Sequence, residues 1–162
     1  MSLYKRIIGF RALLLFGACG FKPVYATSTS TNSVRKNFDL SAPTDRGTYE
    51  FHHNLKGQIS DNPQAKYALS YTIFQSATNA ATDADRKSHR GVLKGSLANR
   101  ITRKINGQTV KTGNVKGFTS YSALASSVAS DAAGRDSTKR LMKILSDNLV
   151  DELMMVAAKG EM

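Results

Sequence analysis

The stretch VLKGSLANRITRKINGQTVKTGNVKGFTSY, Val92–Tyr121, decides the fold that this sequence predicts. Apolar residues recur every four positions in its first half, a spacing that suits one side of a helix or one face of a strand: Leu93, Leu97, Ile101 and Ile105. Gly95 and Thr102 disfavour a helix, and Asn106-Gly107 is a strong signal for a tight β-hairpin turn. We therefore predict an antiparallel hairpin that pairs residues 92–105 with residues 108–121.

A two-residue turn at Asn106-Gly107 predicts which residues face each other across this hairpin. Ile105 should oppose Gln108, and by the same register Lys104 opposes Thr109 and Thr102 opposes Lys111. The core face would then carry Leu93, Leu97, Ile101, Ile105, Val110 and Phe118. The other face would carry Lys94, Ser96, Arg100, Thr102, Lys104, Thr109 and Lys111. On that face three cations should gather, those of Arg100, Lys104 and Lys111.

Two strands and a helix are predicted before the hairpin. KNFDLS, residues 36–41, is a short strand with Phe38 and Leu40 on one face. TDRGTYEFHHNLKGQI, residues 44–59, follows a proline and opens on two good N-cap residues, so we expect a helix with a stripe of Thr48, Tyr49, His52, Leu55 and Ile59. KYALSYTIFQ, residues 66–75, alternates as a strand does. A polar, Ala-rich connection over residues 76–89 should join it to the hairpin.

A second helix is predicted after the hairpin, in STKRLMKILSDNLVDELMMVAAK, residues 137–159. Its apolar stripe indicates a helix that covers the inner face of the sheet rather than a groove for a partner: Leu141, Ile144, Leu145, Leu149, Leu153 and Val156. The order of elements predicts an α+β fold, with a four-stranded, mainly antiparallel sheet and two helices packed on one face. We expect a single domain over residues 36–162.

The N-terminal region contains the only cysteine of the chain, Cys19, in LLLFGACGFKPVY, residues 13–25. Basic residues precede a short apolar run, which is typical of a secretory signal peptide. Arg11 interrupts this run, so it falls short of the about 20 apolar residues that span a bilayer. Gly17-Ala18 before Cys19 resembles a bacterial lipobox, although Phe16 stands where leucine is usual.

We therefore predict a lipoprotein signal peptide over residues 1–18 and a lipidated N-terminus with a flexible tether over residues 19–35. Cys19 would carry diacylglycerol and an N-acyl chain, which together anchor a protein stably in a membrane. The alternative for Cys19 is a buried free thiol that packs as a small apolar residue.

The charge of the chain is strongly basic, with a formal net charge of +11 and a pI of about 10.0. Residues 86–130 contain nine Lys and Arg residues and no Asp or Glu. Because like charges across strands destabilise a sheet, this pattern favours an anionic partner such as a phosphorylated glycolipid. The alternative is a solvated face whose cations block edge-to-edge aggregation. Nucleic acid also attracts basic hairpins, but the export signal argues against it.

Three segments together resemble the LptE family, lipopolysaccharide-assembly lipoproteins of Gram-negative outer membranes. They are ACGFKPVY (residues 18–25), the hairpin SLANRITRKINGQTVKTGNVKGFTSY and the helix end LSDNLVDELMM. The resemblance implies an outer-membrane protein, facing the periplasm and the barrel lumen, that plugs an LptD-like β-barrel, helps it assemble and binds lipopolysaccharide. The charged connection at residues 83–91 departs from the family. A lipoprotein of another envelope-assembly machine, without lipopolysaccharide binding, is the alternative.

The predicted register selects the lipopolysaccharide contacts. We expect Arg100, Lys104 and Lys111 to bind the lipid, with Lys94 and Arg90 as secondary contacts. Catalysis is not expected, because the three histidines have no acid, nucleophile or metal-ligand partner at a useful spacing. No cofactor is expected beyond the covalent lipid on Cys19.

Overall fold

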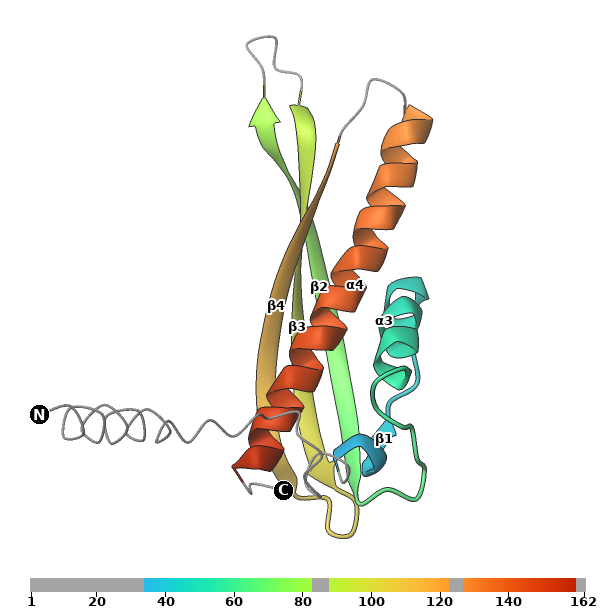
Figure 1. The fold of residues 1–162 in the computed structure, drawn as a ribbon, viewed down its shortest axis with the longest axis vertical. Helices are drawn as coiled ribbons and strands as arrows, with labels where there is room; N and C mark the ends of the chain where they lie inside the picture. The colour runs from blue at the N-terminus through green and yellow to red at the C-terminus, as the bar shows by residue number, and fades with distance from the viewer. Residues whose placement is uncertain (1–33, 83–87, 123–126, 160–162) are drawn as a thin grey trace, which may run out of the picture.

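A computed structural model describes residues 34–82, 88–122 and 127–159, which form one sheet with two helices against one of its faces (Figure 1). The elements follow the chain as β1 (Phe38–Leu40), α3 (Arg46–Lys56), β2 (Tyr67–Thr82), β3 (Ser88–Arg103), β4 (Thr109–Ser122) and α4 (Ser127–Ala158). The strands lie in the order β1-β2-β3-β4; β1 is parallel to β2, and the other pairs are antiparallel. The predicted α+β fold is confirmed.

Helix α3 begins with a reciprocal pair of hydrogen bonds. The Thr48 backbone N–H donates to Asp45 Oδ1 (3.0 Å), and the Asp45 N–H donates to Thr48 Oγ1 (2.9 Å). Phe51, His52 and Leu55 are buried, whereas Tyr49 is 60% exposed, so the prediction that Tyr49 joins the buried stripe is wrong. Because successive helical residues are rotated by about 100°, Tyr49 and Phe51 lie on nearly opposite sides of α3. Phe51 faces the core, so Tyr49 faces solvent.

The β3–β4 hairpin forms, but its register differs from the prediction. Ile101 opposes Lys111 and Thr102 opposes Thr109, so Val110 is an extra residue on β4. The turn is longer than two residues: the Arg103 N–H donates to the Gln108 carbonyl (2.8 Å), and the Gly107 N–H donates to the Arg103 carbonyl (2.9 Å). Gly107 takes a φ of 68°, which glycine adopts without strain.

This slip of one residue reverses the face of every β4 side chain beyond the bulge. Phe118 opposes Lys94 and is 71% exposed, so the prediction that it lies in the core is wrong. Ile105 is likewise wrong as a core residue, because it lies in the turn and is 89% exposed. Leu97 and Ile101 are buried as predicted, and Leu93 and Val110 pack at the edge of the core.

Two elements are longer than predicted. Strand β2 continues to Thr82 and pairs there with Ser88, so most of the predicted connection over residues 76–89 is strand. Main-chain hydrogen bonds continue the pairing of β2 with β3 beyond the region where their side chains are buried in the core. Helix α4 begins at Ser127, ten residues before the predicted Ser137. No helix within residues 34–82, 88–122 and 127–159 is long and apolar enough to cross a membrane.

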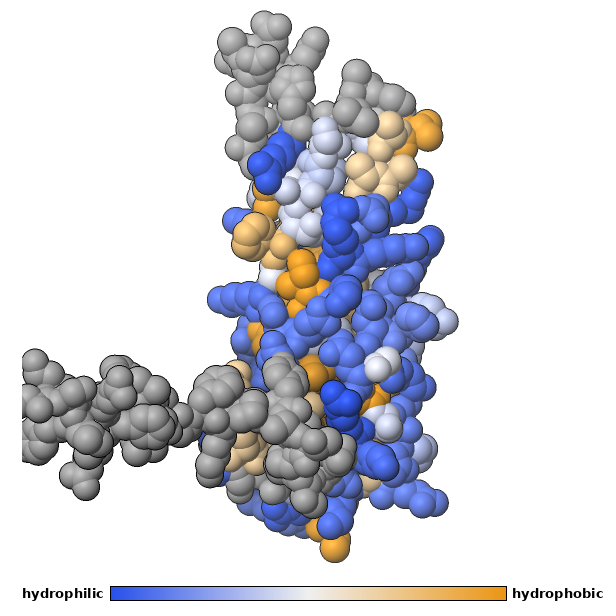
Figure 2. Space-filling view, in the orientation of Figure 1, coloured by the Kyte–Doolittle hydropathy of each residue, from blue (hydrophilic) through white to orange (hydrophobic). Residues whose placement is uncertain are grey.

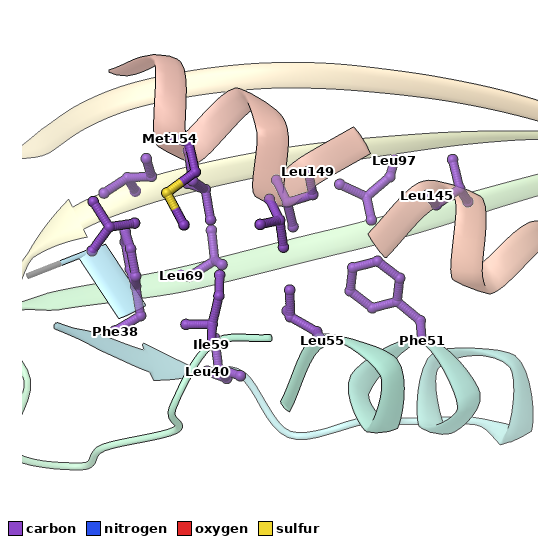
Figure 3. Close-up of a cluster of buried hydrophobic side chains, with 14 of the residues drawn as sticks. Phe38, Leu40, Phe51, Leu55, Ile59, Leu69, Leu97, Leu145, Leu149 and Met154 are labelled. Atoms are coloured by element: carbon purple, nitrogen blue, oxygen red, sulfur yellow. The ribbon is translucent and has the colours of Figure 1, made fainter. Parts of the chain in front are cut away.

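The core lies between the sheet and the two helices, where side chains from β1, α3, β2, β3 and α4 meet in one cluster (Figure 3). Five residues of the predicted α4 stripe are buried, and Ile144 is half-buried: Leu141, Leu145, Leu149, Leu153 and Val156. Gly95 and Gly117 oppose each other beneath this helix. A Cβ at Gly117 would lie 2.9 Å from Ile144 Cγ2, so the two glycines allow α4 to approach the sheet closely.

A partly buried chain of hydrogen bonds links α3 to β2 and to the end of β1. The Tyr71 hydroxyl donates to the Ser41 carbonyl (3.1 Å), so the His52 Nδ1–H must be the donor to Tyr71 at 2.9 Å. Burial lowers the pKa of His52 below its usual value; the Lys56 charge adds to this effect and Asp61 opposes it. Burial also raises the pKa of Tyr71 to about 12. Both groups therefore stay neutral in the folded protein at pH 7.

Candidate functional site

The face of the sheet opposite the helices carries an apolar surface set among cations. We call it the open face; its side chains come from the even-numbered residues of β2 up to Thr78, of β3 from Arg90 onward and of β4 beyond the bulge. On the other side, the helices present a largely hydrophilic outer surface (Figure 2).

Three strands place two phenylalanines of the open face on either side of β3. Phe74 of β2 opposes Ser96 of β3, and Ser96 opposes Lys116 of β4. One row along, Lys94 of β3 opposes Phe118 of β4. Phe74 is 64% exposed and Phe118 is 71% exposed. Contiguous exposed apolar patches, unlike single exposed apolar residues, commonly mark binding surfaces.

A groove of about 650 Å³ lies between these rings. Its lining includes Phe74, Ser76, Val92, Lys94, Lys116 and Phe118. A volume of this order is typical of small-molecule sites, in which apolar walls supply most of the contact and a few polar groups orient the ligand. We call this site the open-face groove.

The charge of the open-face groove is positive. Lys94 and Lys116 are diagonal neighbours across β3 and β4. Neither ammonium group forms an ion pair within the part of the chain that the structure describes. A lysine ammonium group can bind a phosphate or carboxylate, and an exposed phenylalanine ring can contact an alkyl chain. Chemically, the groove suits an amphiphile with an acyl chain and an anionic group.

The predicted lipid-binding cations do not gather at one place. Arg90, Lys94 and Arg100 lie on the open face of β3, where Arg90 Nη2 donates to Ser120 Oγ (2.9 Å). Lys111 opposes Ile101 and so lies on the helix face, contrary to the predicted register. The bulge at Val110 is the reason.

Lys104 belongs to the turn and is held by other parts of the fold. Its Nζ donates to Asp39 Oδ2 of β1 (2.5 Å) and to the Pro63 carbonyl (2.7 Å). The prediction that Arg100, Lys104 and Lys111 gather on one face of the sheet is therefore wrong. Cys19, together with Arg86 and Lys87, lies outside the described residues.

The predicted site included Lys94 but lacked the other side chains that give the open-face groove its character, Phe74, Lys116 and Phe118. Phe74 carried a signal, because it alternates with Tyr71 and Ile73 onto the polar side of β2. Lys116 is part of the basic run. Phe118 could not be placed without the register of β4. Among the described residues, no cluster of His, Cys, Asp and Glu side chains is suited to hold a metal ion.

Comparison with known proteins identifies the fold. No protein-family model matches the chain, and no curated protein sequence matches it. Rare lipoprotein B from Shewanella oneidensis superposes with a TM-score of 0.60 at 11% identity, over 78% of this chain and 98% of that one. A candidate lipoprotein from Caulobacter crescentus gives 0.64 at 18% identity, over 80% and 96%. A minor lipoprotein from Acinetobacter baumannii gives 0.53 at 17% identity, over 75% and 92%. The chain shares its fold with these bacterial lipoproteins.

Proposed function

We propose that this chain is a lipid-anchored protein of the Gram-negative outer membrane that binds lipopolysaccharide and assists an LptD-like β-barrel in inserting it. The fold shared with rare lipoprotein B and other lipoproteins carries the proposal. The lipobox-like sequence before Cys19 and the LptE-like segments support it. The proposed role is binding and assembly, without catalysis, cofactor or nucleic acid.

The open-face groove supplies the binding mode of this proposal. Phe74 and Phe118 contact acyl chains of the lipid, while Lys94 and Lys116 meet its phosphates. Arg90 and Arg100 lie on the same face of β3 and extend the cationic surface along the strand. Lys104 and Lys111 were predicted as further contacts; their positions in the turn and on the helix face suit the role less well.

The decisive experiment reverses the charges of the two lysines of the groove, with the double substitution Lys94→Glu and Lys116→Glu. Two charge-assisted hydrogen bonds of about 1.5–3 kcal/mol each would be lost, and solvent screening reduces their sum. We therefore expect lipopolysaccharide binding by the purified protein to weaken roughly 10- to 100-fold. Thermal stability should stay unchanged, because both side chains are exposed.

A matched control changes the net charge equally at two exposed lysines outside the groove, Lys139 of α4 and Lys159 just after it, with Lys139→Glu and Lys159→Glu. This control should keep its affinity for lipopolysaccharide. Equal loss of binding in both variants would show that net charge alone, and not the open-face groove, attracts the lipid.

The anchor and the partner are tested in cells. Cys19→Ala should leave the precursor unprocessed, at higher mass in the inner membrane, because the modified thiol is what the peptidase recognises. The wild-type chain should co-purify from outer membranes with a large β-barrel. Co-purification with a different envelope assembly, and no binding of lipopolysaccharide, would favour a lipoprotein of another machine.

A further inference from the structure

One end of the molecule combines an exposed apolar side chain with several cations. The turn between β3 and β4 presents Ile105, which is 89% exposed. The Lys104 backbone N–H donates to the Lys66 carbonyl (2.9 Å), so this turn packs beside the start of β2. A hollow of about 420 Å³ lies there, lined by Ala65, Lys66, Tyr67, Arg103, Lys104 and Ile105. We call Lys66, Arg103, Lys104 and Ile105 the turn tip.

The turn tip is cationic. Within the described part of the chain, Lys66 and Arg103 form no ion pair. The acidic side chains nearby are already engaged: Asp39 binds Lys104 at 2.5 Å, and Asp61 binds Lys56 at 2.9 Å. The remaining positive charge therefore faces solvent around an apolar side chain. This is the pattern of a residue that enters the headgroup region of a bilayer whose surface is anionic.

The chain enters the folded domain at this same end. Val34, the first described residue, is buried, and the Asn37 carbonyl accepts a hydrogen bond from the Tyr67 N–H (3.2 Å). Figure 1 shows β1 and the β3–β4 turn together at one end of an elongated molecule, with the start of α4 at the other. Cys19 precedes Val34 by about 15 residues, which span at most about 50 Å. The segment that leads from Cys19 therefore joins the domain at the turn-tip end.

We propose that the turn tip rests on the membrane surface, with Ile105 at the boundary of headgroups and acyl chains and with Lys66 and Arg103 against anionic phospholipid headgroups. This proposal rests on the lipid anchor of the proposed function. One apolar side chain and a few cations bind a bilayer weakly by themselves. An anchor a few nanometres away raises their effective concentration at the surface, so the same contacts suffice to orient the domain.

The chain has no tryptophan, so a single introduced tryptophan reports its own surroundings. The test compares Ile105→Trp with Val128→Trp, an exposed position at the opposite end on α4. Each full-length, lipidated protein is reconstituted into vesicles of phosphatidylcholine with phosphatidylglycerol whose acyl chains are brominated. Ile105→Trp should shift its emission to the blue and lose most of its fluorescence, while Val128→Trp should show neither change.

Further arms separate the causes. Adding Lys66→Gln and Arg103→Gln to Ile105→Trp should reduce quenching in anionic vesicles and leave it unaltered in vesicles of phosphatidylcholine alone. Equal quenching at positions 105 and 128, in protein that floats with the vesicles, would overturn the proposal. A blue shift without quenching would also overturn it, because it would mean that the tip is buried against another protein copy. Quenching at position 105 in protein that lacks the lipid on Cys19 would uphold the contact of the turn tip with the bilayer and show that this contact does not depend on the anchor.

Discussion

The two faces of this sheet are built by the same strands, yet one forms the core and the other leaves phenylalanines and lysines exposed. Gly117 and Phe118 are neighbours in the chain and show the contrast. Gly117 lies under α4, where a Cβ would touch Ile144, whereas Phe118 points to the open face and is largely exposed. Because side chains alternate along a strand, one step along the chain separates a tightly packed position from an exposed one.

The difference shows that apolar character alone does not reveal which face of this protein is its core. Leu97 and Ile101 on the helix face are buried in the core, and their burial contributes to stability. Phe74 and Phe118 on the open face are comparably apolar, but no element of the described structure covers them. Their contact area remains available to a ligand. Substitutions on the two faces should therefore have separate consequences, which four experiments test.

Leu145→Ala should have the largest effect on stability. Leu145 is fully buried between α4 and the sheet, and removing such a side chain leaves a cavity that costs about 2–5 kcal/mol. Phe118→Ala on the open face should change the free energy of unfolding by less than about 0.5 kcal/mol. Urea unfolding of both variants measures the contrast. A large loss in Phe118→Ala would mean that the open face is covered in the native protein.

Gly117→Val tests the close approach of α4 to the sheet. The added side chain would meet Ile144 and force the helix outward, so we expect a loss of about 1–3 kcal/mol in the free energy of unfolding. The matched control is Lys116→Val, which places the same side chain one residue earlier, on the open face. If both substitutions cost the same, the register of β4 described above is wrong.

Lys104→Gln distinguishes a structural cation from one that faces a ligand. The ion pair with Asp39 is partly exposed, so its loss should lower the free energy of unfolding by no more than about 1 kcal/mol. Lys94→Gln should leave stability unchanged and weaken lipopolysaccharide binding instead. Thermal unfolding and lipid binding are measured for both variants. If Lys104→Gln weakens lipid binding without changing stability, Lys104 contacts the lipid, as the sequence predicted.

Substitution of His52 should have the smallest effect on the free energy of unfolding, and this effect should depend on pH. His52 packs on the helix side of the sheet, so lipopolysaccharide binding on the open face should not change. Its folded pKa lies below the usual 6.5, because burial and Lys56 disfavour the imidazolium. The unfolded state therefore takes up a proton first, so stability is complete above pH 6.5 and falls as the pH drops from there towards the folded pKa. His52→Gln should flatten the dependence of the unfolding free energy on pH in this window. If the dependence of the unfolding free energy on pH is the same in His52→Gln, other titratable groups cause it.

Much of the architecture could be predicted from local patterns. Alternation in residues 66–75 predicts β2, the stripe of Leu141, Leu145, Leu149 and Leu153 predicts α4, and Asp45 predicts the start of α3. Each of these signals depends on side chains within a few residues of one another. The lengths of β2 and α4 were underestimated, because main-chain hydrogen bonds extend both elements beyond their apolar patterns.

The sequence by itself therefore determined the elements, their order and the basic character of the hairpin. Only the tertiary structure decided which β4 side chains face the helices. The turn at Asn106-Gly107 is closed by Arg103 and Gln108, and Lys104 within it binds Asp39 and Lys66 from distant parts of the chain. These long-range contacts, with the bulge at Val110, shift the register by one residue. Because side chains alternate with a period of two, that shift moves Phe118 out of the core and Lys111 onto the helix face.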